Sequence, residues 1–260
     1  MYTRKFIAYL DILGFKDLVS NNSHERVCSL YEKLFATMTT IAISGGKTIL
    51  VNDGDKQHAT YDSSNIKVNS LIISDSVVIW TDDNSMKSFV DIIAVLRHLL
   101  NYSLKMGLPL RGSLVEGNLD KINQTFQSSK DNSQITLIGL GLVKAYVFES
   151  EQEWSGCIIE NECIDLYNSN VEKNKAELKD IATLEYLVEK NLIMKYRAPL
   201  KTGSISDYYV INWEPSNDLT ESFVRERFKA YNKKTSDWKV ERILKNTIEF
   251  INFCKEKNGR

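Results

Sequence analysis

Two hydrophobic periodicities follow one another along the chain and predict alternating strands and helices. "RKFIAYL" (4–10) is apolar at nearly every position, which predicts a strand buried on both faces. After Ser23, a suitable N-cap, apolar residues recur at helical spacing from Val27 to Ile41. The stretch "IKVNSLIISDSVVIW" (66–80) then predicts two strands joined by a tight Ser-Asp-Ser turn.

The same alternation continues to about residue 150. A long helix is predicted from Asn84 or Ser85, then a strand over 108–119 and a strand, glycine turn and helix over 133–151. The polar stretch 44–65 predicts a short hairpin and loop. This order of elements favours the fold class α+β, with a ferredoxin-like βαββαβ sheet covered by helices on one face.

The last third of the chain predicts additional strands and helices. We expect residues 1–150 to form the core domain and residues 151–260 a C-terminal extension packed on it, without a clear boundary. The elements expected in the extension are a strand at 155–160, a helix near 174–190, a hairpin over 192–213 and a final helix from about 237.

Composition excludes several classes of partner. The chain has 33 basic and 34 acidic residues among 260, so its charge gives no ground for a nucleic-acid or membrane partner. We expect no signal peptide and no membrane span, and four scattered cysteines favour reduced thiols in a cytoplasmic protein. The basic stretch "AYNKKTSDWKVER" (230–242) is typical of a solvated helical face.

Two acids interrupt segments that are otherwise strongly apolar. Asp11 follows the first strand in "AYLDILGFKDLV", and Asp75 lies in "LIISDSVVIW". Each has a simple interpretation, as a helix cap or a turn residue. In the predicted sheet, however, both acids fall at the same edge, where two carboxylates repel unless a cation lies between them. The three histidines stand apart, so a metal here needs oxygen ligands, which favours Mg²⁺ or Mn²⁺.

The residues after Asp11 suit a phosphate group. A helix is predicted to begin there, and free N–H groups at a helix start attract anions. Gly14 permits close backbone approach and Lys16 adds a positive charge. Asp11 is therefore expected to hold a metal that neutralises a bound triphosphate.

The chain resembles the class III nucleotidyl cyclases over about residues 4–150. The motifs that carry the resemblance are "YLDILGFK", "IISDSVVI", "LRGSLVEG" and "IGLGLVKAYVFES", in the family's order. The resemblance implies a nucleoside triphosphate substrate and a homodimer with shared sites. It also implies two Mg²⁺ or Mn²⁺ ions held by Asp11, Asp75 and the carbonyl of Ile12, next to the substrate-binding residues Gly14, Phe15 and Lys16.

The sequence departs from the family at the residues that stabilise the transition state. Val143 and Val147 stand where the family has Asn and Arg, and a valine cannot donate a hydrogen bond. The cations available to replace them are Arg111, Lys144 and Lys16, of which Arg111 is favoured because a strand positions it. Simpler interpretations are that Arg111 is a surface residue and that Lys144 faces solvent.

The base-reading positions also differ from those of adenylyl cyclases. Leu71 replaces a purine-reading Lys, and Thr136 occupies the second position. Tyr146 is a candidate for stacking on the base, although packing in the core is the commoner use. With "RGSLVEG" and "AYVFES", these features are similar to bacterial pyrimidine cyclases of the antiphage Pycsar type, which make cyclic CMP or cyclic UMP.

Three functions therefore stay open at the level of sequence. The first is a metal-dependent cyclase acting on CTP or UTP. The second is a degenerate cyclase-like domain that binds nucleotide or a protein partner without turnover, as Val143 and Val147 suggest. The third is a polymerase-like palm, for which "ISDSV" is a poor match.

Overall fold

The structure is a computed structural model that describes residues 4–42, 48–53, 56–61, 68–125, 133–174, 183–214 and 218–258. Its elements, in chain order, are β1 (Arg4–Ile12), α1 (Phe15–Ser20), α2 (His24–Ala42), β2 (Thr48–Asp53), β3 (Lys56–Tyr61), β4 (Asn69–Ile73), β5 (Ser76–Trp80), α3 (Met86–Lys105), β6 (Leu110–Asn118), β7 (Asp120–Thr125), β8 (Ser133–Ile138), α4 (Leu140–Ser150), β9 (Cys157–Ile159), α5 (Asn161–Lys173), α6 (Leu184–Glu189), β10 (Ile193–Pro199), β11 (Ile205–Ile211), α7 (Glu221–Lys229), the 3₁₀ turn η3 (Ala230–Asn232) and α8 (Trp238–Asn258).

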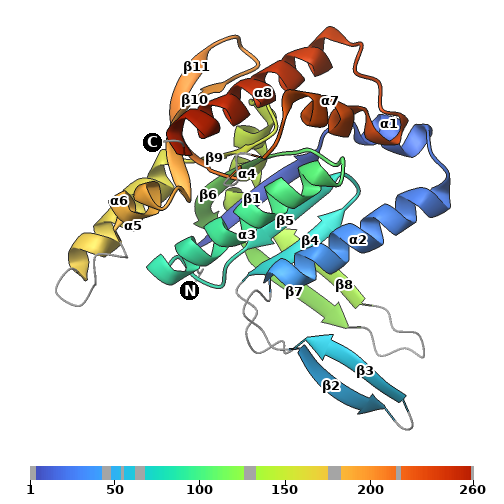
Figure 1. Cartoon of the computed structure of the whole chain (residues 1–260). Coiled ribbons are helices and arrows are strands. Elements are labelled where there is room, and N and C mark those ends of the chain that lie inside the picture. Colours follow the sequence, from blue (N-terminus) through green and yellow to red (C-terminus); the bar gives the residue numbers. More distant parts are fainter. Residues whose placement is uncertain are drawn as a thin grey trace.

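A mostly antiparallel sheet of seven strands organises the molecule, in the order β10-β11-β9-β6-β1-β5-β4 (Figure 1). β1 lies between β5 and β6 and is antiparallel to both, whereas β6 and β9 are parallel. The α+β fold class expected from the sequence is confirmed. Strands β9, β10 and β11 from the C-terminal extension continue the same sheet beyond β6, so they complete it instead of forming a separate layer.

Successive side chains of β1 point to opposite faces of the sheet and pack into two different hydrophobic cores. Phe6, Ala8 and Leu10 belong to the large core that also contains residues of α2, α3 and α8, while Ile7 belongs to a smaller core with Ala145 of α4. Figure 1 shows α2 and α3 in front of the sheet and α4 behind it. Because side chains alternate along a strand, the odd-numbered Asp11 shares the α4 face with Ile7.

Close backbone contact fixes α4 on that face. A Cβ atom on Gly117 of β6 would lie 2.7 Å from the Cα of Gly141 in the first turn of α4. Gly141 is followed on the same helical stripe by Ala145 and Glu149, and all three are buried. α4 therefore lies directly on β6, and its last turn reaches the end of the sheet where β6 begins and β1 ends.

Most predicted elements are present, with three differences, all after residue 119. β7 was not predicted; it pairs with β8 along its whole length as a separate hairpin. The helix expected near 174–190 is confirmed only at α6 (Leu184–Glu189), since 175–182 lie outside the described residues, and α5 (Asn161–Lys173) was not predicted. The expectation of a solvated basic face at 230–242 is wrong at Lys233, which is buried.

No helix in the described part of the chain combines the length and apolar character needed to cross a bilayer. Three of the four cysteines are buried and Cys28 is exposed, and none is paired in a disulfide.

The Gly117–Gly141 contact gives a stability prediction. Gly117→Ala should lower the free energy of unfolding by about 1–3 kcal/mol, because the new methyl group must push α4 away from β6. Thermal unfolding followed by circular dichroism measures the loss. An unchanged melting temperature would show that the two backbones are not in such close contact.

Candidate active site

The two acids singled out in the sequence meet at one edge of the sheet. In the register of the sheet, Asp11 pairs with Ser76, the residue after Asp75. The backbone N–H of Ile12 donates a hydrogen bond of 2.8 Å to the carbonyl oxygen of Asp75. Asp11 does not cap α1, whose N-cap is Gly14 without a side-chain cap. The juxtaposition expected from the topology is therefore present.

Arg111 lies beside Asp11 and is held from three directions. The two residues are direct partners in the β1–β6 register, and the Arg111 Nη2 atom is 3.7 Å from Asp11 Oδ2. The Arg111 Nε atom donates to Glu149 Oε1 at 2.5 Å, and its Nη1 donates to the carbonyl of Gln152 at 3.2 Å. Arg111 and Glu149 are both buried. The surface interpretation of Arg111 is therefore wrong, and its guanidinium is already bound within the protein.

Burial and like charges make this end of the sheet electrostatically strained. Burial, reinforced by the negative charges of Glu149 and Asp75, raises the pKa of Asp11 to about 7, although Arg111 opposes the shift. Burial also raises the pKa of Glu149 against the effect of Arg111. Three acids, Asp11, Asp75 and Glu149, thus interact at this end of the sheet, as is common where a cation binds.

Lys201 adds a cation from the C-terminal extension. It follows β10, and its backbone N–H donates to the carbonyl of Glu151 at 2.8 Å, just beyond α4. The positive charge of Lys201 acts on both Asp11 and Glu149. Lys201 is exposed, but partial desolvation by the surrounding protein and the nearby charge of Arg111 lower its pKa.

Aromatic side chains support the turn that carries Asp75. The Tyr31 hydroxyl of α2 donates to the carbonyl of Ser74 at 2.6 Å. The Phe15 ring packs edge-on against the Tyr31 ring, with 6.2 Å between the ring centroids. Ser74 has a positive φ of 56°, an uncommon backbone conformation for a residue other than glycine. These contacts therefore hold the β4–β5 turn in one conformation beside the end of β1.

Gly14 and Lys16 belong to the turn and the first helix that follow β1. Gly14 adopts the left-handed conformation, φ 77°, between β1 and α1, and both residues are exposed. The Leu13 N–H donates to the carbonyl of Pro109 at 2.9 Å, which ties this turn to the start of β6.

Tyr146 is on the surface, so the alternative of core packing is wrong. It lies on α4 and is 53% exposed. Its ring packs edge-on against the ring of Tyr9, with 5.5 Å between the ring centroids. The Tyr9 hydroxyl is 2.5 Å from the Ser76 hydroxyl, next to Asp75. Tyr146 is therefore one aromatic ring away from the acid pair and open to a ligand.

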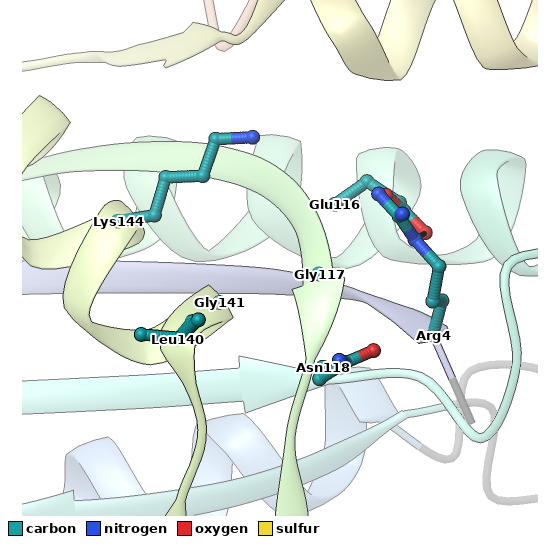
Figure 2. Close-up of a pocket in the computed structure, with 7 residues that line it drawn as sticks. All are labelled: Arg4, Glu116, Gly117, Asn118, Leu140, Gly141 and Lys144. Atoms are coloured by element: carbon teal, nitrogen blue, oxygen red, sulfur yellow. Dashed lines mark hydrogen bonds and ion pairs between the residues drawn. The ribbon is translucent and has the colours of Figure 1, made fainter. Parts of the chain in front are cut away.

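Lys144 lies at the other end of the sheet from the acid pair. Its Nζ atom contacts Glu160 at 2.5 Å and Glu162 at 2.7 Å, and it lines a pocket of about 210 Å³ together with Arg4 and Glu116 (Figure 2). Arg4 is seven residues from Asp11 along β1, about 23 Å in an extended strand. The expectation that Lys144 simply faces solvent is also wrong, because it is ion-paired.

The remaining candidate residues are spread over the α4 side of the sheet. Leu71 of β4 packs against the smaller core, and Thr136 of β8 is half-buried opposite Ile122 of β7. Val143 and Val147 are 59% and 43% exposed on α4. Neither valine contributes a hydrogen-bond donor to the acid pair of its own chain.

The oxygen donors at the acid pair fit Mg²⁺ or Mn²⁺. Asp11, Asp75 and a neighbouring backbone carbonyl offer oxygen atoms, which are the hard ligands that these ions prefer. Within the described ranges, no group of three His, Cys, Asp or Glu side chains is arranged around a common point. Mg²⁺ is commonly held by one or two carboxylates plus substrate phosphates, which is the arrangement available here.

The sequence interpretation missed Glu149 and Lys201. Glu149 could have been found, because Gly141, Ala145 and Glu149 recur every four residues and therefore share the buried stripe of α4. That stripe lies over the face of β6 that carries Arg111. Lys201 gave no comparable signal, since its position depends on how the extension adds to the sheet.

Comparisons with known proteins found similar solved structures only. No family model and no curated protein sequence matches the chain. Similar structures include the guanylate cyclase domain of RhGC from Catenaria anguillulae in complex with GTP, with 13% identity, a TM-score of 0.47, and coverage of 81% of this chain and 97% of that one. A bacterial light-regulated adenylyl cyclase has 14% identity, a TM-score of 0.44, and coverage of 87% and 99%.

The charge at Asp11 predicts a stabilising substitution. The pKa of Asp11 is raised to about 7 in the folded state from 3.8 in the unfolded chain, so the folded state binds the extra proton and stability falls as pH rises between those values. In EDTA at pH 8, Asp11→Asn should raise the free energy of unfolding by about 1 kcal/mol or more, and the gain should vanish below pH 4. Urea unfolding at both pH values measures it; a loss of stability at pH 8 would contradict the account.

Proposed function

We propose that this protein is a metal-dependent nucleotidyl cyclase that converts a pyrimidine nucleoside triphosphate, CTP or UTP, to its 3′,5′-cyclic monophosphate and pyrophosphate. In the proposed reaction the ribose 3′-oxygen bonds to the α-phosphorus and loses its proton to solvent, while the bond from the α-phosphorus to the oxygen bridging to the β-phosphorus breaks. The cyclic product would serve as a second messenger in antiphage defence of the Pycsar type.

The observation that carries the proposal is the meeting of Asp11 and Asp75. They are 64 positions apart in sequence, yet the Ile12–Asp75 backbone hydrogen bond places them at adjoining strand ends. Asp11, Asp75 and the Ile12 carbonyl would hold the two Mg²⁺ or Mn²⁺ ions. Such ions, when bound, neutralise triphosphate charge and stabilise the entering and leaving oxygens.

The other residues of the site are assigned by position. Gly14, Phe15 and Lys16 would receive the triphosphate at the exposed turn after Asp11. Because the Arg111 guanidinium is bound to Glu149 and Gln152, we assign Arg111 the role of holding the Asp11 carboxylate. Lys16 and Lys201 are exposed cations, of which Lys201 acts on Asp11, and they would take over stabilisation of phosphate charge.

The preference for a pyrimidine is inferred from what the base-reading positions lack. Leu71 offers no donor or acceptor, and Thr136 offers one hydroxyl. The exposed ring of Tyr146 would stack on the base. This part of the proposal depends on residue chemistry, because Leu71 and Thr136 lie on different hairpins.

A homodimer is supported by an apolar surface on α4 and the β7–β8 hairpin. Exposed apolar side chains gather on these consecutive elements, and a contiguous apolar surface often marks a protein interface. In a dimer built on this surface, α4 of one chain would face the site of its partner, as the cyclase resemblance implies. The exposed residues of this surface are Ile122, Ile138, Leu140, Val143, Tyr146 and Val147.

A second function is favoured by one observation. Val143 and Val147 place two apolar side chains on the exposed face of α4, where the family supplies hydrogen-bond donors. A degenerate cyclase-like domain that binds nucleotide or a protein partner would need no donors there.

An activity assay separates these functions. With Mn²⁺ and each of the four nucleoside triphosphates, we expect pyrophosphate and a 3′,5′-cyclic product from CTP or UTP, identified by mass spectrometry. Asp11→Asn and Asp75→Asn should each lower kcat by about 1,000-fold or more, because each removes a ligand charge and keeps the side-chain shape. The exposed Asp165→Asn on α5 is the matched control and should retain full activity.

Three results would contradict the proposal. Nucleotide binding without a cyclic product from any substrate would favour the degenerate domain, and linear oligomers would favour a palm-type polymerase. Full activity in either acid variant would reject the metal assignment.

The apolar surface yields a prediction about assembly. Val143→Asp should convert the dimer to monomer and abolish turnover, because the charge would be buried in the interface. Light scattering after size-exclusion chromatography measures the mass. Val188→Asp, a valine 36% exposed on α6, is the matched control and should remain dimeric. A Val143→Asp protein that is still dimeric would move the interface elsewhere.

A further inference from the structure

The segment 230–234, between α7 and α8, is bound to the parts of the chain that carry the candidate site. The Asn22 side-chain amide donates to the carbonyl of Tyr231 at 2.6 Å, and the Tyr231 hydroxyl donates to the carbonyl of Met106 at 2.8 Å. The backbone N–H of Lys234 donates to Asp17 Oδ2 at 2.8 Å. The segment therefore joins α1 to the turn between α3 and β6.

The backbone of this segment adopts an unusual conformation. Tyr231 and Asn232 are consecutive non-glycine residues with positive φ angles, 60° and 58°. Such residues persist only where their surroundings enforce the conformation, and they occur preferentially at functional sites. Here the enforcement comes from α1 and α3, since the Asn21 side-chain amide also donates to the Asn232 carbonyl at 2.8 Å.

Lys233 lies between the two turns that lead into the site. Its Nζ atom donates to the carbonyl of Gly107 at 2.7 Å, just before β6 begins. Its Cδ atom covers Gly14, where an added Cβ would lie only 2.9 Å away. Gly14 follows Asp11 by three residues and Gly107 precedes Arg111 by four, so one side chain contacts both approaches to the Asp11–Arg111 pair.

Core stability alone does not explain a lysine here. Lys233 is 7% exposed, and burial lowers its pKa to about 7 despite the favourable negative charge of Asp17. Within the described part of the chain, Gly107 is the one acceptor of its hydrogen bonds. An apolar side chain of similar length would fill the space without the cost of burying an amine.

We propose that Lys233 is a positioning residue for the nucleotide site: by contacting the Gly14 turn and the Gly107 turn together, it fixes the ends of β1 and β6 that carry Asp11 and Arg111. The activity part of this inference rests on the proposed cyclase function. It gives the C-terminal extension a role in the site beyond completing the sheet.

The test compares Lys233→Met with Lys234→Met in the full-length protein. Methionine keeps an unbranched apolar side chain of similar length in the buried space, and Lys234 is the exposed neighbour in the same segment. Hydrogen–deuterium exchange of residues 12–17 and 106–111 should accelerate at least tenfold in Lys233→Met and stay unchanged in Lys234→Met. Unchanged exchange in a folded Lys233→Met protein would overturn the proposal.

Activity gives a second measurement that separates positioning from general destabilisation. Lys233→Met should lower kcat at least tenfold with KM within threefold, while its melting temperature equals or exceeds that of the wild type. If the wild type makes no cyclic product, the proposed function fails, but hydrogen exchange still tests Lys233. Wild-type kcat in Lys233→Met would overturn the positioning role.

The pH dependence of stability checks that the amine is buried as described. The unfolded lysine titrates near 10.5 and the folded one near 7, so the wild type gains stability relative to Lys233→Met as pH rises through this interval. The charged groups near the segment are Asp17 of α1 and Arg26 of α2, whose guanidinium lies over the Tyr231 ring. The melting-temperature advantage of Lys233→Met at pH 6.5 should shrink by pH 10; a constant difference would show an exposed amine.

A milder variant keeps the test decisive if Lys233→Met does not fold. Asp17→Asn weakens the acceptor of the Lys234 N–H and removes the charge facing Lys233, without changing the buried volume. It should accelerate exchange in the same two segments by a smaller factor. Exchange equal to that of the wild type would overturn the proposal.

Discussion

The antiparallel pairing of β1 with both β5 and β6 is the constraint on which the rest of the structure depends. This pairing buries the middle of β1 on both faces and leaves only its end available for polar chemistry. It also sets the register that places Asp11 opposite Ser76 on one side and Arg111 on the other. A shift of one residue would turn Asp11 toward the large apolar core. The core packing and the candidate site are therefore products of the same register.

The site is a charged cluster that the fold stabilises only in part. Arg111 is bound to Glu149 and Gln152, which orients it beside Asp11 but leaves the excess of acids uncompensated. A folded protein tolerates such an excess where a bound cation supplies the missing charge, and unbound sites of this kind reduce stability. The proposed metal and triphosphate would thus complete an electrostatic balance that the chain leaves open. The lysines contributed by α1 and by the C-terminal extension lie around this opening.

Local pattern was sufficient to predict most elements of the first 150 residues, β7 excepted, and the meeting of the acids. Period-two and period-3.6 patterns identified β1, α2, β4, β5 and α3, and the topology then placed Asp11 and Asp75 at one edge. The extension was harder, because its contribution depends on long-range pairing. Lys233 shows the limit: a basic, polar stretch indicates a solvated helix, whereas contacts with Gly14 and Gly107, more than 100 residues away, bury the lysine. The helical period of α4 was enough to predict that Glu149 lies on its buried stripe, whereas no local pattern predicted the position of Lys201.

Joint binding of divalent metal by Asp11 and Asp75 beneath a triphosphate can be observed in a crystal structure with Mn²⁺ and a non-hydrolysable CTP analogue, using the anomalous signal of manganese. We expect an anomalous peak about 2.1 Å from a carboxylate oxygen of each acid, with triphosphate oxygens completing the coordination. Nucleotide bound without an anomalous peak between Asp11 and Asp75, or manganese bound elsewhere on the protein, would contradict it.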